Sequence, residues 1–286
     1  MPEKSNKMIE KELISVLIPV FKIKKKLLIQ SISSILEQSY QKIEVIVIFE
    51  KSNSDLDKDI ESVLKEKSKD SRLKVVLQQK KGIANSLNEG INEASGELIA
   101  RMDADDISEK NRFEEQEKFL RENNLDLIGS WATSISENNE ILGTIEPPTK
   151  NSEIRKKIMF HNPFLHPSIM FRKKIIEKIG TYNTSFNGAE DYDLYFRVIS
   201  NGFKVGNIPK PLIRLRETTD SVMRGKNWRK NRKINFQVKK NAVKNLGFNS
   251  TYDLIYFLIT PLTFFVSPKN AFVLKNKIGY NRINQK

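Results

Sequence analysis

Short apolar runs alternate with segments of helical character through the first 130 residues of the chain. Runs typical of buried strands occupy residues 14–20, 45–48, 73–77, 97–102 and 125–130. Segments with helical spacing or composition lie between them, at 27–36, 55–67, 83–94 and 109–124. Because strands that alternate with short helices usually pair in parallel and are covered on both faces, this pattern predicts an α/β fold.

The second part of the chain has a mixed pattern. Asn138 and Asn139, between Ile135 and Ile141, predict a hairpin turn. Short strands are expected at 168–171, 204–208 and 212–215, and helices at 173–179 and 189–201. From about Val222 the pattern favours a basic helix, followed by an apolar stretch at 252–266. That stretch is shorter than the roughly 20 residues that a membrane-spanning helix needs.

The positive charge of the chain is concentrated at its C-terminal end. The formal net charge is +14, from 49 Lys and Arg against 35 Asp and Glu. The segment Arg224–Lys286 holds 14 of these basic residues and one acidic residue, Asp253, so the rest of the chain is nearly neutral. A basic block of this kind is typical of an interaction tail or a membrane-surface segment.

The composition excludes several kinds of chemistry. The chain has no cysteine, which rules out disulfides, thiolate nucleophiles and cysteine-ligated zinc. Two histidines, His161 and His166, are too few for a multi-histidine metal site. Hydrophobic residues make up 38% and charged residues 29%, as in soluble or peripheral globular proteins. The polar N-terminal dozen residues resemble no secretory signal, so we expect a cytoplasmic protein.

The expected strand at 97–102 is followed by three aspartates, Asp103, Asp105 and Asp106. Ligands of open α/β sheets bind beyond the carboxyl ends of the strands. Carboxylates packed there repel each other unless a cation intervenes, and Mg²⁺ prefers carboxylate and phosphate oxygens. The segment therefore suggests a metal ion that holds a diphosphate. Helix capping is the alternative, above all for Asp106 or Ser108.

A second acidic group opens the expected helix at 189–201. Glu190, Asp191 and Asp193 precede and interleave with apolar residues of that helix. Capping of the helix is again one interpretation. The other is that an aspartate beside a ligand site acts as general base toward a hydroxyl.

Together these segments resemble glycosyltransferase family 2, the inverting GT-A type, and especially bacterial enzymes that assemble exopolysaccharide, capsule or lipopolysaccharide. The resemblance covers about residues 13–216. It is carried in order by Ser15–Phe21, Ser31–Tyr40, Glu44–Val47, Gly82–Gly90, Ala94–Asp106, Arg112-Phe113 and Glu190–Asp193. It implies a Rossmann-like, mostly parallel GT-A sheet with helices on both faces in a catalytic domain at 1–221. A nucleotide-sugar half would lie at about 13–108 and an acceptor half at about 109–221, with a basic, partly apolar helical extension at 222–286.

The resemblance also implies a nucleotide pocket. The pocket for the nucleotide base would be lined by Pro19, Val20 and Phe21. Lys81 and Gly82 would face the nucleotide. Family members usually carry two Asp and a Gly after the second strand, where this chain has Phe49-Glu50-Lys51-Ser52. Glu50 is the candidate replacement for the acid that accepts from the base.

At the aspartate segment the resemblance implies contacts to ribose and metal. Asp103 and Ala104 would contact the nucleotide, and Asp105, with Asp103, would hold Mg²⁺ or Mn²⁺. Arg101 is a candidate phosphate partner or simply a surface arginine. His166 falls at a family position near metal and diphosphate, although a lone histidine is also often a hydrogen-bonded structural group. His161 is interpreted as structural.

The implied reaction is inverting hexosyl transfer from a nucleotide-diphosphate sugar, with a UDP-sugar as the expected donor. Asp191 matches the family's catalytic base, and Glu190 would lie on the acceptor side. The acceptor would be a glycan or a lipid-linked glycan in surface polysaccharide synthesis. We expect the basic tail to hold the protein peripherally on the inner, anionic face of the bacterial membrane; packing of the tail on the catalytic domain is the alternative.

Two other classes of function compete with this interpretation. A nucleotidyltransferase on a similar sheet is the enzymatic alternative, but no Gly-rich phosphate loop lies near the first strand. A nucleic-acid binder would use the basic tail, with Trp228 and Phe236, but would leave both acidic groups without a role, so we expect no nucleic-acid partner. A dehydrogenase is disfavoured because no G-x-G-x-x-G follows a strand.

Overall fold

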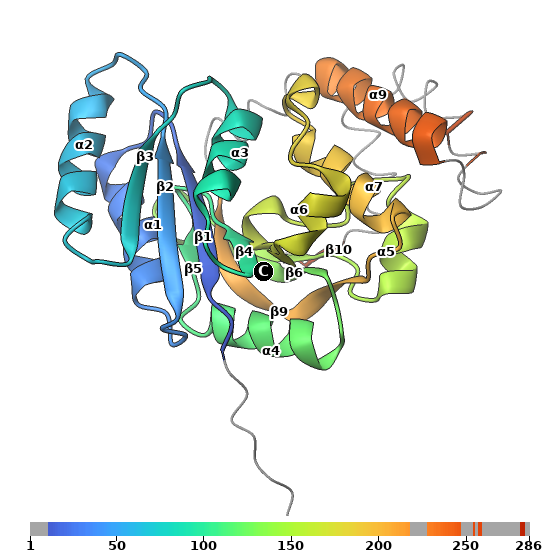
Figure 1. The fold of residues 1–286 in the computed structure, drawn as a ribbon, viewed down its shortest axis with the longest axis horizontal. Coiled ribbons are helices and arrows are strands. Elements are labelled where there is room, and N and C mark those ends of the chain that lie inside the picture. The colour runs from blue at the N-terminus through green and yellow to red at the C-terminus, as the bar shows by residue number, and fades with distance from the viewer. Residues whose placement is uncertain (1–10, 218–227, 247–253, 255–256, 259–280, 284–286) are drawn as a thin grey trace, which may run out of the picture.

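A computed structural model describes residues 11–217, 228–246, 254, 257–258 and 281–283 (Figure 1). Its N-terminal strands form a parallel sheet in the order β3-β2-β1-β4. These strands are β1 (Ile14–Val20), β2 (Ile43–Phe49), β3 (Leu73–Leu77) and β4 (Leu98–Arg101). The order places β4, the strand before the three aspartates, inside the sheet, between β1 and β8.

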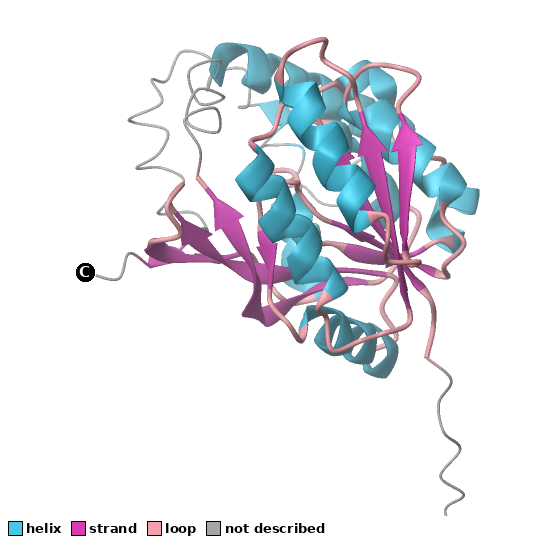
Figure 2. Ribbon diagram, turned by 90° about the vertical axis from the view of Figure 1, so that its left-hand side faces the viewer, coloured by secondary structure: helices cyan, strands magenta, loops and turns pink. Residues whose placement is uncertain are grey.

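The second half of the chain continues the same sheet with mainly antiparallel pairs. Its strands are β5 (Ile107–Ser108), β6 (Leu127–Ile135), β7 (Ile141–Glu146), β8 (Met170–Arg172), β9 (Val205–Arg216) and β10 (Asn281–Ile283). β8 lies antiparallel between β4 and β6, and β6 and β7 form the predicted hairpin, with Asn139 at a φ of 69°. In Figure 2 the strands of this half run in a different direction from the upright parallel strands.

Helices cover both faces of the sheet, as predicted. One core contains apolar residues of α1 (Lys25–Leu36), α2 (Leu56–Lys67) and α4 (Arg112–Glu122). The other contains residues of α3 (Ile83–Glu93), α5 (Asn151–Lys157), α6 (Lys174–Ile179) and α7 (Glu190–Ser200). Alternation along β1 explains the division, since Val16 and Ile18 belong to the first core and Leu17 to the second. The predicted α/β fold is confirmed; the division into halves at 13–108 and 109–221 stays a prediction.

The structure corrects the expected strands at 204–208 and 212–215. They are one strand, β9, which contains Pro209 and Pro211. Its parallel register with β6 shifts at Trp131, so that Ile208 pairs with Ser130 but Pro211 pairs with Trp131. Proline interrupts a ladder because it has no N–H to donate, and the shift accommodates this without ending the strand.

Part of the C-terminal extension is described, and its helix is confirmed. α9 (Trp228–Leu246) is rich in lysine and arginine, and it lies beside α7 (Figure 1). Val238 and Ala242, one turn apart, are buried in the core that α7 shares. The rings of Phe236 and Phe257 stack, with 5.4 Å between their centroids. Most of the apolar stretch at 252–266 lies outside the described residues. Among the helices that the structure does describe, none combines the length and apolar character needed to cross a bilayer.

Candidate active site

The three aspartates after β4 come together as the sequence predicts. A carboxylate oxygen from each of Asp103, Asp105 and Asp106 lies within 4.8 Å of the others. The loop is held from α1, where Ser31 Oγ donates to the carbonyl of Asp103 at 2.8 Å. Asp103 and Asp105 are half-buried and Asp106 is buried. Three converging carboxylates, two of them open to solvent, suit a hard divalent cation that also binds substrate oxygens.

Asp106 connects this loop to the end of β9. Its Oδ1 accepts from the Arg216 main-chain N–H at 2.8 Å, while its Oδ2 is buried without a hydrogen-bond partner. Burial, and then the charges of Asp103 and Asp105, raise the pKa of Asp106 well above its usual range. Arg216 also donates from Nε to the carbonyl of Asp105 at 2.8 Å. The end of β9 therefore fixes the aspartate loop.

Helix capping by Asp106 or Ser108 is not what the structure shows. The residue that precedes α4 as its N-cap is Asn111. Ser108 lies in β5, where its main-chain N–H donates to Ser34 and its hydroxyl accepts from Gln38. The aspartate segment thus turns away from the sheet and returns as a short strand on β9 before the helix begins.

Arg101, the last residue of β4, is buried rather than on the surface, with 5% of it exposed. Its Nη2 donates to the Asp103 carboxylate in an ion pair. The other two guanidinium nitrogens, Nε and Nη1, are buried without a hydrogen-bond partner. The interpretation of Arg101 as a plain surface arginine is therefore wrong.

A second buried arginine, for which the sequence suggests no role, lies next to the last residue of β4. Arg112 at the start of α4 is fully buried. Its Nη2 donates to the carbonyl of Arg101 at 2.8 Å, and its Nε donates to Gln116 at 2.9 Å. Gln116 in turn donates to the carbonyl of Ser168 at 2.7 Å. Burial, and then the charge of Arg101, lower the pKa of Arg112 to about 9. The i, i+4 spacing of Arg112 and Gln116 on one helix face was the available signal.

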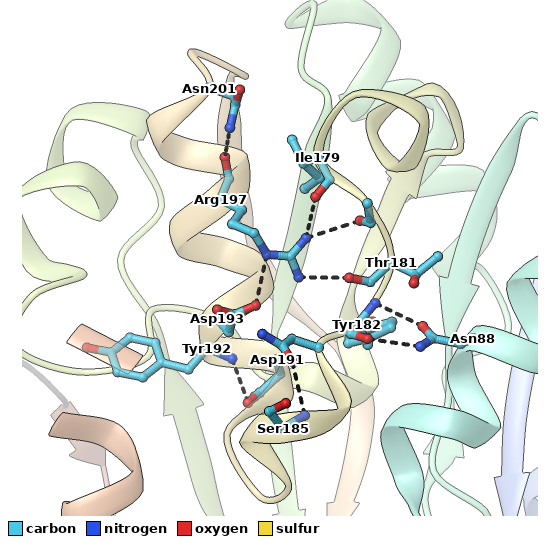
Figure 3. A network of polar contacts seen from close by, with 12 residues as sticks. Asn88, Ile179, Thr181, Tyr182, Ser185, Asp191, Tyr192, Asp193, Arg197 and Asn201 are labelled. Atoms are coloured by element: carbon cyan, nitrogen blue, oxygen red, sulfur yellow. Dashed lines mark hydrogen bonds and ion pairs between the residues drawn. The ribbon is translucent and has the colours of Figure 1, made fainter. Parts of the chain in front are cut away.

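His166 begins the short 3-10 helix η1 (His166–Ser168), which precedes β8. Its Nε2 lies 3.0 Å from the Tyr182 hydroxyl. Burial and the charge of Arg101 lower the pKa of His166 well below its usual range, so the ring is neutral. Tyr182 is itself fixed by two main-chain bonds with Asn88 of α3, each 2.9 Å long (Figure 3). His166 thus has the hydrogen-bond partner that is expected of a structural group. It also lies close enough to Arg101 for the arginine charge to lower its pKa.

Asp191, in the first turn of α7, is held by two hydrogen bonds and has a raised pKa. Its carboxylate accepts from Asn162 Nδ2 at 2.6 Å and from the Tyr192 N–H at 2.7 Å. Burial, followed by the charge of Glu190, raises the pKa of Asp191 to about 6, and Arg101 acts in the opposite direction. A carboxylate of this pKa is largely ionised at neutral pH yet is a better proton acceptor than an ordinary aspartate.

The other two acidic residues of α7 have local partners. Glu190 is buried and accepts from the Gly188 N–H at 2.6 Å. Asp193 accepts from Arg197 at 2.8 Å, one turn along the helix (Figure 3). Arg197 also donates to the carbonyls of Ile179 and Thr181, at 2.7 and 2.8 Å. Asp193 and Arg197 therefore hold the turn that leads to Tyr182. The N-cap residue of α7 is Ala189, which has no side-chain cap.

The expected nucleotide residues gather at the ends of β1 and β2. Val20 is buried, Phe21 is half exposed, and the Glu50 N–H donates to the Val20 carbonyl at 3.0 Å. The Glu50 carboxylate accepts from the Gly82 N–H at 2.9 Å. Gly82 precedes α3 with a φ of 101°, a backbone conformation that favours glycine. The structure thus joins Glu50 directly to Gly82; Pro19 and exposed Lys81 are chain neighbours of this set.

Arg101 connects the two acidic segments of the sequence. It pairs with Asp103, and its charge acts on both His166 and Asp191. A cavity of about 240 Å³ lies elsewhere and includes none of the predicted site residues; Trp131, Glu146, Pro147, Pro148, Thr149, Glu153 and Lys157 line it. The residues predicted for the metal and the base, Asp103, His166 and Asp191, are therefore connected through Arg101.

Comparison with known proteins gives the family. The model described as Glycosyl transferase family 2 matches residues 15–180, more than half of the chain. This chain belongs to glycosyl transferase family 2. The matched residues of this glycosyltransferase include the aspartate segment and His166 and end before Asp191.

A curated relative has a related sequence over most of its length. The O-antigen biosynthesis glycosyltransferase WbnJ of Escherichia coli is 35% identical over 190 residues, which are 66% of this chain and 72% of WbnJ. Because two thirds of the chain align at this identity, the resemblance extends well beyond short motifs.

Two solved structures share the fold of this family 2 glycosyltransferase. The structure of S. aureus TarS 1-349 in complex with UDP-GlcNAc has a TM-score of 0.66 and 18% identity; the match covers 93% of this chain and 76% of that one. The mannosyltransferase PcManGT of Pyrobaculum calidifontis, with GDP-Man and Mn²⁺, has a TM-score of 0.62 and 16% identity, over 94% and 76%. These likenesses confirm the predicted GT-A fold.

Proposed function

We propose that this glycosyltransferase moves a sugar, with inversion, from a nucleoside-diphosphate sugar to a hydroxyl of a glycan or lipid-linked acceptor in bacterial surface polysaccharide synthesis. The observation that carries the proposal is the arrangement around Arg101. Arg101 forms an ion pair with Asp103, a member of the aspartate group that suits a cation. The charge of Arg101 also acts on Asp191, a carboxylate whose pKa is raised to about 6. The group that would hold the departing diphosphate and the carboxylate that would act as base thus both interact with one guanidinium.

The donor would bind at the carboxyl ends of β1, β2 and β4. Residues Pro19, Val20, Phe21, Glu50, Lys81 and Gly82 would contact the nucleotide, with Asp103 and Ala104 at the ribose. A UDP-sugar is the donor we favour, since the related fold of TarS has been solved with UDP-GlcNAc. The second oxygen of the Glu50 carboxylate, beside the one bound to Gly82, would accept from the base.

The donor set of the aspartate loop fits Mg²⁺ or Mn²⁺. Asp105 and Asp103 would hold the ion, with His166 as a further candidate ligand. When bound, such an ion offsets the negative charge that grows on the departing diphosphate. Support comes from the convergence of the carboxylate oxygens within 4.8 Å.

Asp191 would take the proton of the acceptor hydroxyl. The hydroxyl oxygen then attacks the anomeric carbon from the side opposite the diphosphate, forming the new C–O bond as the bond to the phosphate oxygen breaks. Nucleoside diphosphate leaves with the electron pair of that bond, and the configuration inverts. Asn162 and the Tyr192 N–H hold the Asp191 carboxylate for this task. Glu190, which accepts from the Gly188 N–H, would lie on the acceptor side.

The C-terminal extension would attach the enzyme to the anionic membrane surface, on the cytoplasmic side. In the described part of α9, Val238 and Ala242 are buried against the catalytic core, whereas Lys233, Lys240 and Lys244 are exposed. The apolar side of α9 is thus used inside the protein, so attachment by this helix would rest on charge. Each Lys near an anionic surface contributes about 1 kcal/mol.

The deciding experiment identifies both donor and leaving group. Purified protein is screened with UDP- and GDP-sugars and Mn²⁺ by thermal shift, and the best donor is then incubated with a bacterial membrane extract as the source of acceptor. Release of nucleoside diphosphate together with a glycosylated product supports the proposal. Release of pyrophosphate would instead indicate a nucleotidyltransferase.

A further inference from the structure

Arg101 is a buried cation, and some of its N–H groups have no hydrogen-bond partner. One nitrogen, Nη2, pairs with Asp103, while Nε and Nη1 are buried without partners. Buried N–H groups of charged side chains are seldom left unpaired, because the loss of hydration is costly. An unpaired guanidinium edge inside a substrate site is therefore evidence that an oxygen of a ligand belongs there.

Among the described residues, no carboxylate forms a hydrogen bond with Nε or Nη1 of Arg101. Its charge reaches Asp191 and the aromatic residues His166, Tyr182 and Tyr195. His166 is neutral, and the raised pKa of both tyrosines keeps them neutral as well. These three side chains therefore carry no charge that would compete with an anionic oxygen for the guanidinium.

The partner that Arg101 does have is a residue of the aspartate loop. Asp103 is 38% exposed at its side chain, whereas Arg101 is 6% exposed. In the protein alone, Arg101 therefore neutralises one of three carboxylates that repel each other, in the role a bound cation would fill. A cation and Arg101 compete for the same carboxylate.

We propose that Arg101 is an exchangeable counter-ion. It neutralises Asp103 in the free protein, and it turns to an oxygen of the nucleotide's diphosphate when a divalent cation takes over Asp103. This inference rests on the proposed function, and it adds a coupling. The cation and the diphosphate favour each other's binding because the cation releases Arg101 for the diphosphate, and the diphosphate releases Asp103 for the cation. Arg112 behind β4 remains on main-chain carbonyls and takes no part in the exchange.

The test compares Arg101→Gln with the wild type in two binding measurements. Mn²⁺ binding to protein without nucleotide is followed by electron paramagnetic resonance, and UDP binding at saturating Mn²⁺ by calorimetry. Because a neighbouring opposite charge changes the proton affinity of a carboxylate by a factor of about ten or more, we expect Arg101→Gln to bind Mn²⁺ alone about tenfold more tightly. UDP should bind to it about tenfold more weakly.

A matched control is Arg155→Gln. Arg155 of α5 donates to the carbonyls of Ile199 and Phe203 at 2.8 and 3.0 Å, away from the aspartate loop. Its replacement should change neither affinity. Arg101→Lys, which retains the charge, is the second variant if Arg101→Gln does not fold, and it should bind Mn²⁺ like the wild type.

The outcomes separate this inference from the function on which it rests. If the wild type binds Mn²⁺ and UDP but Arg101→Gln binds Mn²⁺ no more tightly, Arg101 is a fixed structural partner and only the exchange is overturned. If the wild type binds no nucleotide with any cation, both proposals fail. A crystal structure with Mn²⁺ and UDP gives a direct view: Nη2 of Arg101 should have left Asp103, and a guanidinium nitrogen should bond the diphosphate.

Discussion

Asn162 donates a hydrogen bond of 2.6 Å to the carboxylate of Asp191, from the loop that follows α5. The bond favours the ionised carboxylate and so opposes the burial that raises its pKa to about 6. Asn162→Ala removes this opposition, and we expect the pKa of Asp191 to rise by roughly one unit. Because the base must be ionised, the acidic limb of kcat/KM against pH should move to higher pH; an unmoved limb contradicts the assignment of Asp191.

Asp191→Asn should abolish transfer and leave UDP affinity unchanged. Loss of a general base lowers turnover by about 10²–10⁴-fold, measured as nucleoside diphosphate released with acceptor present. Turnover near that of the wild type would rule out the catalytic role.

The same substitution has a predicted effect on stability. The folded-state pKa of Asp191 lies above its unfolded value, so its ionisation costs the wild type stability as pH rises from about 4 to about 6. Asp191→Asn lacks this loss. Thermal melts of both proteins at pH 4 and pH 7 should show a smaller drop in Tm for the variant.

Asp105→Ala should eliminate the cation dependence of donor binding. Calorimetry of UDP with and without Mn²⁺ should show a difference for the wild type and none for the variant. Asp70→Asn is a suitable control, because Asp70 pairs with Arg72 in the loop before β3. If Asp105→Ala retains the full Mn²⁺ effect, the aspartate loop does not hold the ion.

Arg112→Lys should weaken the fold even though it retains the charge. A lysine cannot reach the Arg101 carbonyl and Gln116 together, so at least one buried polar group loses its partner, at a cost of about 1–3 kcal/mol. Urea denaturation measures this loss. An unchanged midpoint would mean that water or another group replaces the guanidinium.

Charge reversal on α9 tests membrane attachment. Changing Lys233, Lys240 and Lys244 to Glu removes three cations and adds three anions at exposed positions. At about 1 kcal/mol for each lost cation, partition onto phosphatidylglycerol vesicles should fall by about 100-fold or more. UDP binding and partition onto neutral phosphatidylcholine serve as controls. Equal partition of both proteins onto anionic vesicles would exclude α9 as the attachment.

Most elements of the first half of the chain could be predicted closely, because each of these has a hydrophobic pattern within its own residues. The bounds of β1 and β3 agree residue for residue with the apolar runs. β5 could not be predicted, since two residues are too short for any periodicity. The continuity of β9 could not be predicted either, because prolines usually end a strand. In both places, pairing with distant strands overrides the local preference.

The acidic residues of the site could be predicted, but their partners could not. Asp106 is held by Arg216, which is 110 residues away in sequence, and no local pattern records such a contact. The burial of Arg101 likewise depends on elements that meet only in the folded chain. The role of Glu50 with Gly82 joins two loops 32 residues apart. The sequence indicates candidate groups for the chemistry, and the fold determines which of these groups interact with one another.

Tyr182 links parts of the chain far apart in sequence, with consequences for how substrate enters and product leaves. Its main chain is bonded twice to Asn88 of α3, and its hydroxyl to His166 before β8. A hinge opening between α3 and the segment that holds Tyr182 would have to break both bonds to Asn88, while the bond between Tyr182 and His166 would remain. We therefore expect α3 and the segment around Tyr182 to keep their relative position during turnover, and spent nucleotide to depart by rearrangement of exposed loops.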